Sequence, residues 1–200
     1  AKVNGGHWSD DGTGHGYDRR FEFIDDCVGE GKIAVSFVFP AGNPFDHVDE
    51  AEMKKISASE LKQLYQNEGI DEGKAKNAAD QITRFRDWPH PMPLLLYRGR
   101  NTIARFGYLD GSYEFNPAGF MNGKYSGGYQ HMRDVKWAEV PEEINRSALP
   151  DGLSKWAKNP QSVLDYTVEP RSEEADFLSL AWGFGFAMSE LSDSQRRVLR

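Results

Sequence analysis

The sequence predicts an α+β domain, and three observations lead to this prediction. Apolar residues recur at helical spacing between Ala75 and Phe85, which predicts an amphipathic helix. Directly afterwards, Leu94–Tyr97 and Thr102–Leu109 predict two strands joined by a turn, and therefore a hairpin. A third run, Lys32–Phe39, is largely apolar on both faces, which is typical of a central strand.

The remaining elements are predicted in chain order around these three. The glycine-rich loop and the helix near the start, and the capping-box spacing Ser57–Glu60 before a second helix, follow from standard end signals. Acidic residues in the first turn favour a last helix from Ser172. The other predicted segments are a strand near 2–4, a helix over 18–28, a polar loop over 40–56, a glycine-rich loop over 117–128, a strand over 132–140, a helical turn over 147–156 and a short strand over 163–168.

Length and cysteine content bound the class of protein. A chain of 200 residues fits one domain, or one domain with a small appendage. No stretch resembles a secretory signal or a membrane span, so no membrane partner is expected. The single cysteine, Cys27, excludes an internal disulfide framework and fits a reducing cytoplasm, where we expect the protein to be located.

The charge of the chain limits how it can meet nucleic acid. The formal net charge is -7 and the sequence pI is about 5.3, which weighs against binding that relies mainly on phosphates. Basic residues are nevertheless concentrated in the middle of the chain. A pocket that reads one nucleotide on a locally basic face therefore remains compatible with the composition.

The segment around the predicted hairpin combines aromatic rings, guanidinium groups and one amide. Its members are Asn77, Trp88, Tyr97, Arg98 and Arg100. Such a set suits the flat face and the hydrogen-bonding edge of a nucleobase. The alternative is that the same aromatics pack in an ordinary core while the arginines face solvent.

The sequence gives no positive indication of catalysis. The five histidines are scattered, no phosphate or dinucleotide fingerprint is present, and no metal site, cofactor or catalytic residue is expected. One short acidic pattern imitates that of metal-dependent nucleases, and a small magnesium-dependent nuclease is therefore a third hypothesis. Its residues would be Asp46, Asp49, Glu52 and Lys54.

Several strings, in the same order, resemble the EVE-like domains of the PUA superfamily. The likeness is to the domains at the N-terminus of modification-dependent restriction nucleases of the Mrr and McrBC kind, and it covers roughly residues 12–168. The strings are GTGHGYDRRFEFIDD with its glycine-rich opening, the strand KIAVSF, the asparagine-bearing helix KNAADQITRF, the hairpin LLLYRGRNTIARFGYLDGSYEFNP and the stretch HMRDVKWAEVPEEINRSALPDGL.

The resemblance implies a fold and a set of binding residues. The fold would be a small, bent β-barrel of the PUA, EVE and SRA type, flanked by helices and followed by a C-terminal helix. The implied pocket takes a flipped base between aromatic faces and reads its edge. The implied base-binding residues are Ser36 and Asn77 at the edge, with Phe37 and either Trp88 or Tyr97 as stacking partners. The residues expected to contact the backbone are Arg98, Arg100, Lys124 and Arg133, and a contact of Arg133 with the base is the alternative.

The resemblance also implies a function and a domain division. Residues 1–170 would recognise a modified base in DNA as the specificity part of a restriction system that defends against phage. Residues 171–200 would form a helical segment leading to an HNH or other nuclease module or subunit. An RNA-binding domain or a small-nucleotide sensor using the same pocket is the alternative function.

Overall fold

The computed structural model describes residues 2–4, 17–39, 43–98, 102–125, 128–138, 144–157, 163–164 and 171–180. The chain divides into two compact units, each assembled from separated segments. The first comprises Ala1–Ile24, Pro93–Tyr108 and Lys136–Arg200, and the second comprises Asp25–Met92 and Leu109–Val135. Helix α1 (Tyr17–Gly29) and strand β4 (Thr102–Phe115) contribute residues to both. The predicted α+β class is confirmed, and the predicted division at residue 170 stays a prediction.

Strand β2 (Lys32–Val35) occupies an end of the strand order in the second unit. It pairs antiparallel with β5 (His131–Trp137), and β5 is followed by β4. The prediction that this strand is central is therefore wrong for the part of the sheet that the structure describes. Ile33, Ala34 and Val35 are nonetheless all buried. A strand can be buried on both faces because other elements cover it. A central position in the sheet requires in addition that a strand pairs with it on each side.

The strand is also shorter than predicted. Regular pairing stops at Val35 rather than Phe39. The Ser36 hydroxyl oxygen accepts a hydrogen bond from the Val38 backbone N–H at 3.3 Å. A side chain that bonds its own backbone in this way competes with a sheet ladder, which explains the early end.

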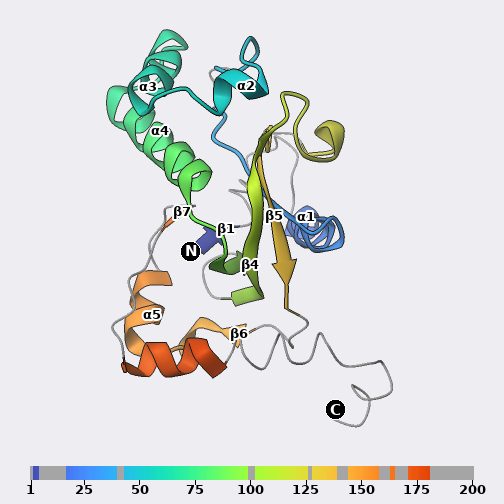
Figure 1. Cartoon of the computed structure of the whole chain (residues 1–200), viewed down its shortest axis with the longest axis vertical. Coiled ribbons are helices and arrows are strands. Elements are labelled where there is room, and N and C mark those ends of the chain that lie inside the picture. The colour runs from blue at the N-terminus through green and yellow to red at the C-terminus, as the bar shows by residue number, and fades with distance from the viewer. Residues whose placement is uncertain are drawn as a thin grey trace. The chain divides into compact units, whose positions relative to one another are not determined.

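Three helices form one side of the second unit, and Figure 1 shows α3 next to α4. Their bounds are α2 (Glu50–Met53), α3 (Ala58–Asn67) and α4 (Glu72–Asp87). The predicted capping box of α3 is present, with the Ser57 hydroxyl accepting from Glu60 N–H and the Glu60 carboxylate accepting from Ser57 N–H. The predicted 40–56 loop contains α2, which the sequence analysis missed. This helix forms because Asp49 caps its start and Met53 buries its side chain.

The first unit holds the other strands and the small helices. The bounds are β1 (Lys2–Asn4), β3 (Met92–Arg98), β6 (Ile144–Asn145), β7 (Val163–Leu164), α5 (Asp151–Ala157), a 3-10 turn η2 (Arg146–Ala148) and a helix over residues 173–180. Strand β1 lies between β3, parallel to it, and β7, antiparallel to it. Strand β4 neighbours β3, as the predicted hairpin requires, and pairs antiparallel with β6.

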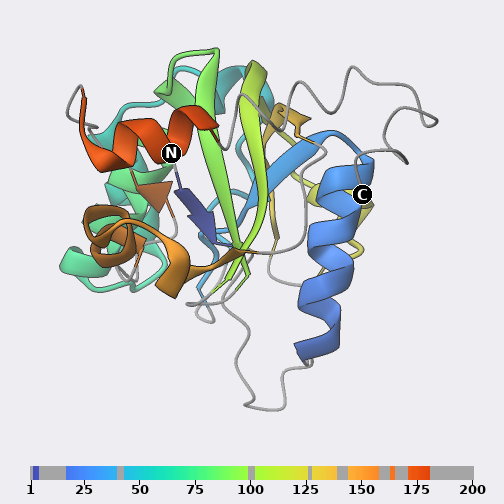
Figure 2. The same ribbon diagram turned by 90° about the horizontal axis from the view of Figure 1, so that it is seen from below.

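The helix over residues 173–180 belongs to the core of the first unit. Figure 2 shows it, in red, near α5, and the Glu174 carboxylate accepts a hydrogen bond from Gly152 N–H at 3.2 Å. Phe177 and Leu178 pack against a buried cluster that includes Leu95, Phe106 and Leu153. This confirms a helix after Ser172. Residues 181–200, over which the predicted helical segment would continue, lie outside the described residues.

Each helix in the described ranges is too short or too polar to cross a bilayer.

Candidate functional site

Two backbone segments of the second unit approach each other more closely than side chains would permit. A Cβ added at Gly119, whose φ is 83°, would lie 2.2 Å from the Gly128 carbonyl oxygen. Gly128 has a φ of 88°, and Tyr129 follows with a φ of 39°. Backbone hydrogen bonds from Phe120 N–H to Tyr129 O and from Asn116 N–H to Gln130 O close the contact. Glycine is required here because a side chain would disfavour the positive φ and would clash.

This arrangement fixes the side chain of Gln130, which is only 2 % exposed. Its amide nitrogen donates to the Pro117 carbonyl oxygen at 2.9 Å. Since a carbonyl oxygen can only accept, the amide nitrogen must face Pro117 and the amide oxygen must face the other way. Among the described residues that oxygen, Oε1, has no hydrogen-bond partner.

The Ser36 hydroxyl and a methyl group of Val38 lie near Gln130. The position that a Cβ on Gly128 would occupy lies 3.5 Å from Gln130 Oε1, 3.6 Å from the Ser36 hydroxyl oxygen and 2.9 Å from a methyl carbon of Val38. The last distance is too short for a real Cβ, so glycine at position 128 allows these side chains to pack tightly against the backbone. Ser36, Val38 and Gly128 are half-buried. An amide acceptor and a hydroxyl thus lie close to one another beside the Gly128 backbone.

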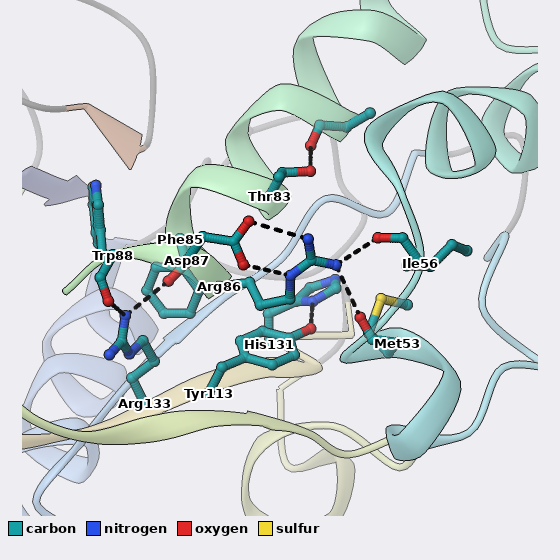
Figure 3. Close-up of polar contacts among 11 residues, drawn as sticks. Met53, Ile56, Thr83, Phe85, Arg86, Asp87, Trp88, Tyr113, His131 and Arg133 are labelled. Carbon is teal, nitrogen blue, oxygen red and sulfur yellow. Dashed lines mark hydrogen bonds and ion pairs between the residues drawn. The ribbon is translucent and has the colours of Figure 1, made fainter. Parts of the chain in front are cut away.

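The neighbouring residue His131 is the first residue of β5. It is 1 % exposed and lies among the rings of Phe37, Phe45, Tyr113 and Phe115. Its Nδ1 is hydrogen-bonded to the Tyr113 hydroxyl at 2.6 Å, and Nε2 lacks a partner within the described ranges (Figure 3). Burial lowers the pKa of His131 to about 3, so the ring is neutral at ordinary pH.

Phe37, a predicted stacking residue, belongs to this histidine cluster. Its ring centroid lies 5.9 Å from that of His131 in an edge-to-face arrangement, and its side chain is 8 % exposed. Stacking on a base therefore requires one face of Phe37 to be uncovered on binding. Its role stays a prediction.

The side chain of Arg133, a residue of β5, lies against the C-terminal end of α4. Its guanidinium donates to the carbonyl oxygens of Phe85 at 3.2 Å and Trp88 at 2.7 Å (Figure 3). It also donates to the carbonyl oxygen of Gly111 at 2.9 Å. The side chain is 1 % exposed, and burial lowers its pKa. A cation that satisfies the last carbonyls of a helix is favourable. Contact with a nucleic acid would require some of these bonds to break.

Trp88 and Lys124 are likewise engaged within the second unit. The buried Trp88 ring meets that of Phe85 edge to face, with centroids 5.8 Å apart. The Lys124 ammonium forms an ion pair with Asp26 at 2.5 Å, and the Tyr125 hydroxyl bonds the same carboxylate. Burial tends to raise the pKa of Asp26, but these two hydrogen bonds outweigh it and leave the pKa below its ordinary value.

The other predicted binding residues have different surroundings. Asn77 is exposed on α4, and its backbone carbonyl accepts from the Gln81 amide at 3.5 Å. Tyr97 lies in the core of the first unit, where burial raises its pKa. The side chain of Arg98 and the whole of Arg100 lie outside the described residues.

Three of the four residues of the magnesium-dependent nuclease hypothesis have structural roles instead. Asp46 accepts a hydrogen bond from the Asn43 side chain at 2.6 Å, Asp49 caps α2, and Lys54 pairs with Glu50 at 2.7 Å. Across the part of the chain that the structure describes, no three acidic, histidine or cysteine side chains group as metal ligands. This arrangement gives the nuclease hypothesis no support.

Sequence analysis singled out Ser36 but missed its neighbour Gln130. Gln130 lies where the predicted glycine-rich loop meets the predicted strand, and nothing in its immediate sequence marks it as a binding residue. His131 begins the string HMRDVKWAEVPEEINRSALPDGL, but the sequence analysis assigns no role to it. Only the pairing of β2 with β5, which sets Val35 opposite His131, brings Gln130 near Ser36.

Comparison with known proteins adds no further assignment. No family model, no curated protein and no solved structure gave a match to this chain.

Proposed function

We propose that this chain recognises a modified base in DNA, with Ser36 and Gln130 reading the edge of that base. The observation that supports the proposal is the buried acceptor Gln130 Oε1, which has no partner in the described residues and lies near the Ser36 hydroxyl. A buried polar atom without a hydrogen bond costs about 1–3 kcal/mol. Such an atom calls for an explanation, and the one proposed here is a donor supplied by a ligand.

The polar side chains of Ser36 and Gln130 suit a base edge. Extrusion of a base costs a few kcal/mol, so stacking must be joined by hydrogen bonds to the edge. Serine and glutamine side chains offer such bonds. The EVE-like, PUA-type barrel and a place in a modification-dependent restriction system, next to a nuclease, are proposals that rest on the resemblance of the sequence strings.

A binding titration tests the proposal. Fluorescence anisotropy at one moderate salt concentration would compare duplexes that carry 5-methylcytosine, 5-hydroxymethylcytosine, its glucosylated form, N6-methyladenine or no modification. We expect one modified duplex to bind best and Gln130→Met to weaken that binding by about tenfold, since one hydrogen bond is worth roughly 1.4 kcal/mol.

Gln63→Met is the matched control, because Gln63 is exposed on α3 and bonds only Asn67 within that helix. Its affinity should equal that of the wild type. Urea unfolding midpoints would confirm that both variants are folded. Equal affinity of the wild type for all five duplexes would refute the proposal.

A sensor of RNA or of a free nucleotide is the second candidate, and two contacts favour it. Lys124 is paired with Asp26, and the Arg133 guanidinium is occupied by backbone carbonyls, in a chain whose net charge is -7. A pocket for one small ligand needs no row of phosphate contacts. Binding of single-stranded RNA or nucleoside monophosphates at least as tight as binding of any duplex would favour this candidate.

A further inference from the structure

The loop between β4 and β5 carries an Asn–Gly pair in an unusual backbone conformation. Met121 and Asn122 have left-handed backbone angles, with φ of 50° and 55°, and Gly123 has a φ of 80°. Consecutive residues of this kind are rare, because a side chain disfavours positive φ. We infer that Asn122 is a site of spontaneous deamidation whose rate is set by the opening of this left-handed turn.

The turn itself selects both residues of the pair. Asparagine is among the few residues that tolerate a left-handed conformation, since its short polar side chain can bond locally. Gly123 must be glycine, because a Cβ at its φ of 80° would be strained and would lie 3.0 Å from the Ala118 carbonyl oxygen. A glycine after an asparagine leaves the attacking backbone nitrogen unhindered, so conformational demands have placed a reactive pair here.

The reaction needs only water and the chain itself. After losing its proton to hydroxide, the Gly123 backbone nitrogen attacks Cγ of Asn122 and closes a five-membered succinimide ring. The bond between Cγ and Nδ2 breaks, and the amide nitrogen leaves as ammonia. Water then adds to one of the two ring carbonyls and opens the ring to aspartate or isoaspartate. Residues 121–124 are exposed, so water and hydroxide reach the site.

The native backbone keeps the two reacting atoms apart. Ring closure requires the Gly123 nitrogen to lie on the same side of the Cα–C bond as Cβ of Asn122. The ψ of Asn122 is 41°, and at a tetrahedral Cα this angle turns the Gly123 nitrogen almost opposite to that Cβ. Cyclisation therefore requires the turn to open so that ψ can rotate, and its rate follows the population of the open turn.

Buried contacts at both ends of the turn hold it closed. Phe120 and Tyr125 are each 2 % exposed, and their rings stack with centroids 6.2 Å apart. Phe120 N–H donates to Tyr129 O at 3.0 Å, and the Tyr125 hydroxyl donates to the Asp26 carboxylate on α1. The hydroxyl contact can be removed by a single substitution that leaves the turn and the stacked rings in place.

Peptide mapping by mass spectrometry measures the reaction. The full chain would be incubated in mildly alkaline buffer, either folded or unfolded in urea, and then digested with trypsin. The digest separates Asn122 from the other Asn–Gly pair of the sequence, at Asn4. We expect deamidation at Asn122 to be slower in the folded chain by about tenfold or more. Tyr125→Phe should raise the rate in the folded chain severalfold, because it removes the bond to Asp26.

Tyr65→Phe is the matched control. Tyr65 is also fully buried, and its hydroxyl donates to the Phe37 carbonyl oxygen at 2.8 Å, outside this turn. Its rate at Asn122 should equal that of the wild type. A second variant, Asp26→Asn, weakens the same contact from the side of α1 and should resemble Tyr125→Phe. Circular dichroism would establish that all three variants are folded.

Four results would overturn the inference. Equal rates in the folded and unfolded chains would show that the turn gives no protection, and an unmodified Asn122 in the unfolded chain would show that the pair is unreactive. Unchanged rates in both Tyr125→Phe and Asp26→Asn would show that this contact does not hold the turn. Equal acceleration by Tyr65→Phe would show that global unfolding exposes Asn122. None of these measurements involves nucleic acid, so their outcome is independent of the proposed function.

Discussion

His131 shows how one buried residue can couple stability to pH. The ring lies among four aromatic side chains with Nδ1 bonded to the Tyr113 hydroxyl, and burial brings the pKa of His131 to about 3. In the unfolded chain the pKa is about 6.5. Between these values the unfolded chain binds a proton that the folded chain does not, so His131 contributes stability above pH 6.5 and this contribution is lost as the pH falls.

The first stability prediction concerns His131→Asn. Asparagine can replace the hydrogen bond at Nδ1 but does not titrate. The advantage of the wild type over this variant in unfolding free energy should shrink by about 2 kcal/mol between pH 7 and pH 5. Urea unfolding at several pH values measures it.

Tyr113→Phe is the control for this prediction. It removes the hydrogen bond to Nδ1 but retains the histidine. The unfolding free energy of this variant should therefore fall from pH 7 to pH 5, as that of the wild type does. A difference between wild type and His131→Asn that stays constant from pH 7 to pH 5 would contradict the assignment of a neutral, buried ring.

At the scale of elements, the end of α4 is secured by two arginines. Arg133 from β5 bonds the carbonyls of Phe85 and Trp88, and Arg86 bonds the carbonyls of Met53 and Ile56 at 3.2 and 2.6 Å. Arg86 also forms an ion pair with Asp87 at 2.7 Å (Figure 3). Helix α4 is thereby joined both to the sheet of its unit and to the segment that follows α2.

The second stability prediction concerns Arg133→Met. Methionine fills much of the same volume but donates no hydrogen bond, so two buried carbonyl oxygens and the half-buried one of Gly111 lose a partner. We expect the unfolding free energy to fall by roughly 3 kcal/mol or more, since each unsatisfied buried acceptor costs about 1–3 kcal/mol. Chemical denaturation measures the loss.

Lys76→Met is the matched control. Its ammonium pairs with Asp80 one helical turn away on the surface of α4, at 2.6 Å, and such exposed pairs contribute about 0.3–0.5 kcal/mol. A loss below about 1 kcal/mol for Arg133→Met would show that water readily replaces the guanidinium. The predicted role of Arg133 in nucleic-acid binding would then regain weight.

At the scale of the whole molecule, charge decides how binding responds to salt. The net charge is -7, and Lys124, one of the predicted phosphate contacts, is neutralised by Asp26. Each phosphate that a protein neutralises adds about 0.9 to the slope of log K against log salt for duplex DNA. Recognition through the edge of a base contributes almost nothing to this slope.

The corresponding prediction is a weak salt dependence. Between 50 and 300 mM salt, the slope of log K against log salt for the preferred duplex should have a magnitude below about 2. Lys124→Met should change it by much less than one unit, because its charge is already paired. A slope of about 4 or steeper would instead indicate a row of phosphate contacts.

The local elements were largely determined by the sequence itself. Apolar periodicity predicted α4, the capping box of Ser57 and Glu60 predicted the start of α3, and alternation predicted β5. Each of these signals depends on residues a few positions apart. The helix α2 escaped prediction because a single turn is too short for a periodic signal, and its cap, Asp49, resembles any polar loop residue.

Only the tertiary structure decided what the predicted residues do. Arg133 reads as an exposed cation in sequence, but it is buried against carbonyls that precede it by 45 and 48 positions. Ser36 acquires Gln130 as a neighbour because the antiparallel pairing of β2 with β5 sets Val35 opposite His131, one position away from each of them. Burial, hydrogen-bond satisfaction and pKa depend on distances between residues far apart in the chain, and those distances are set by packing rather than by local pattern.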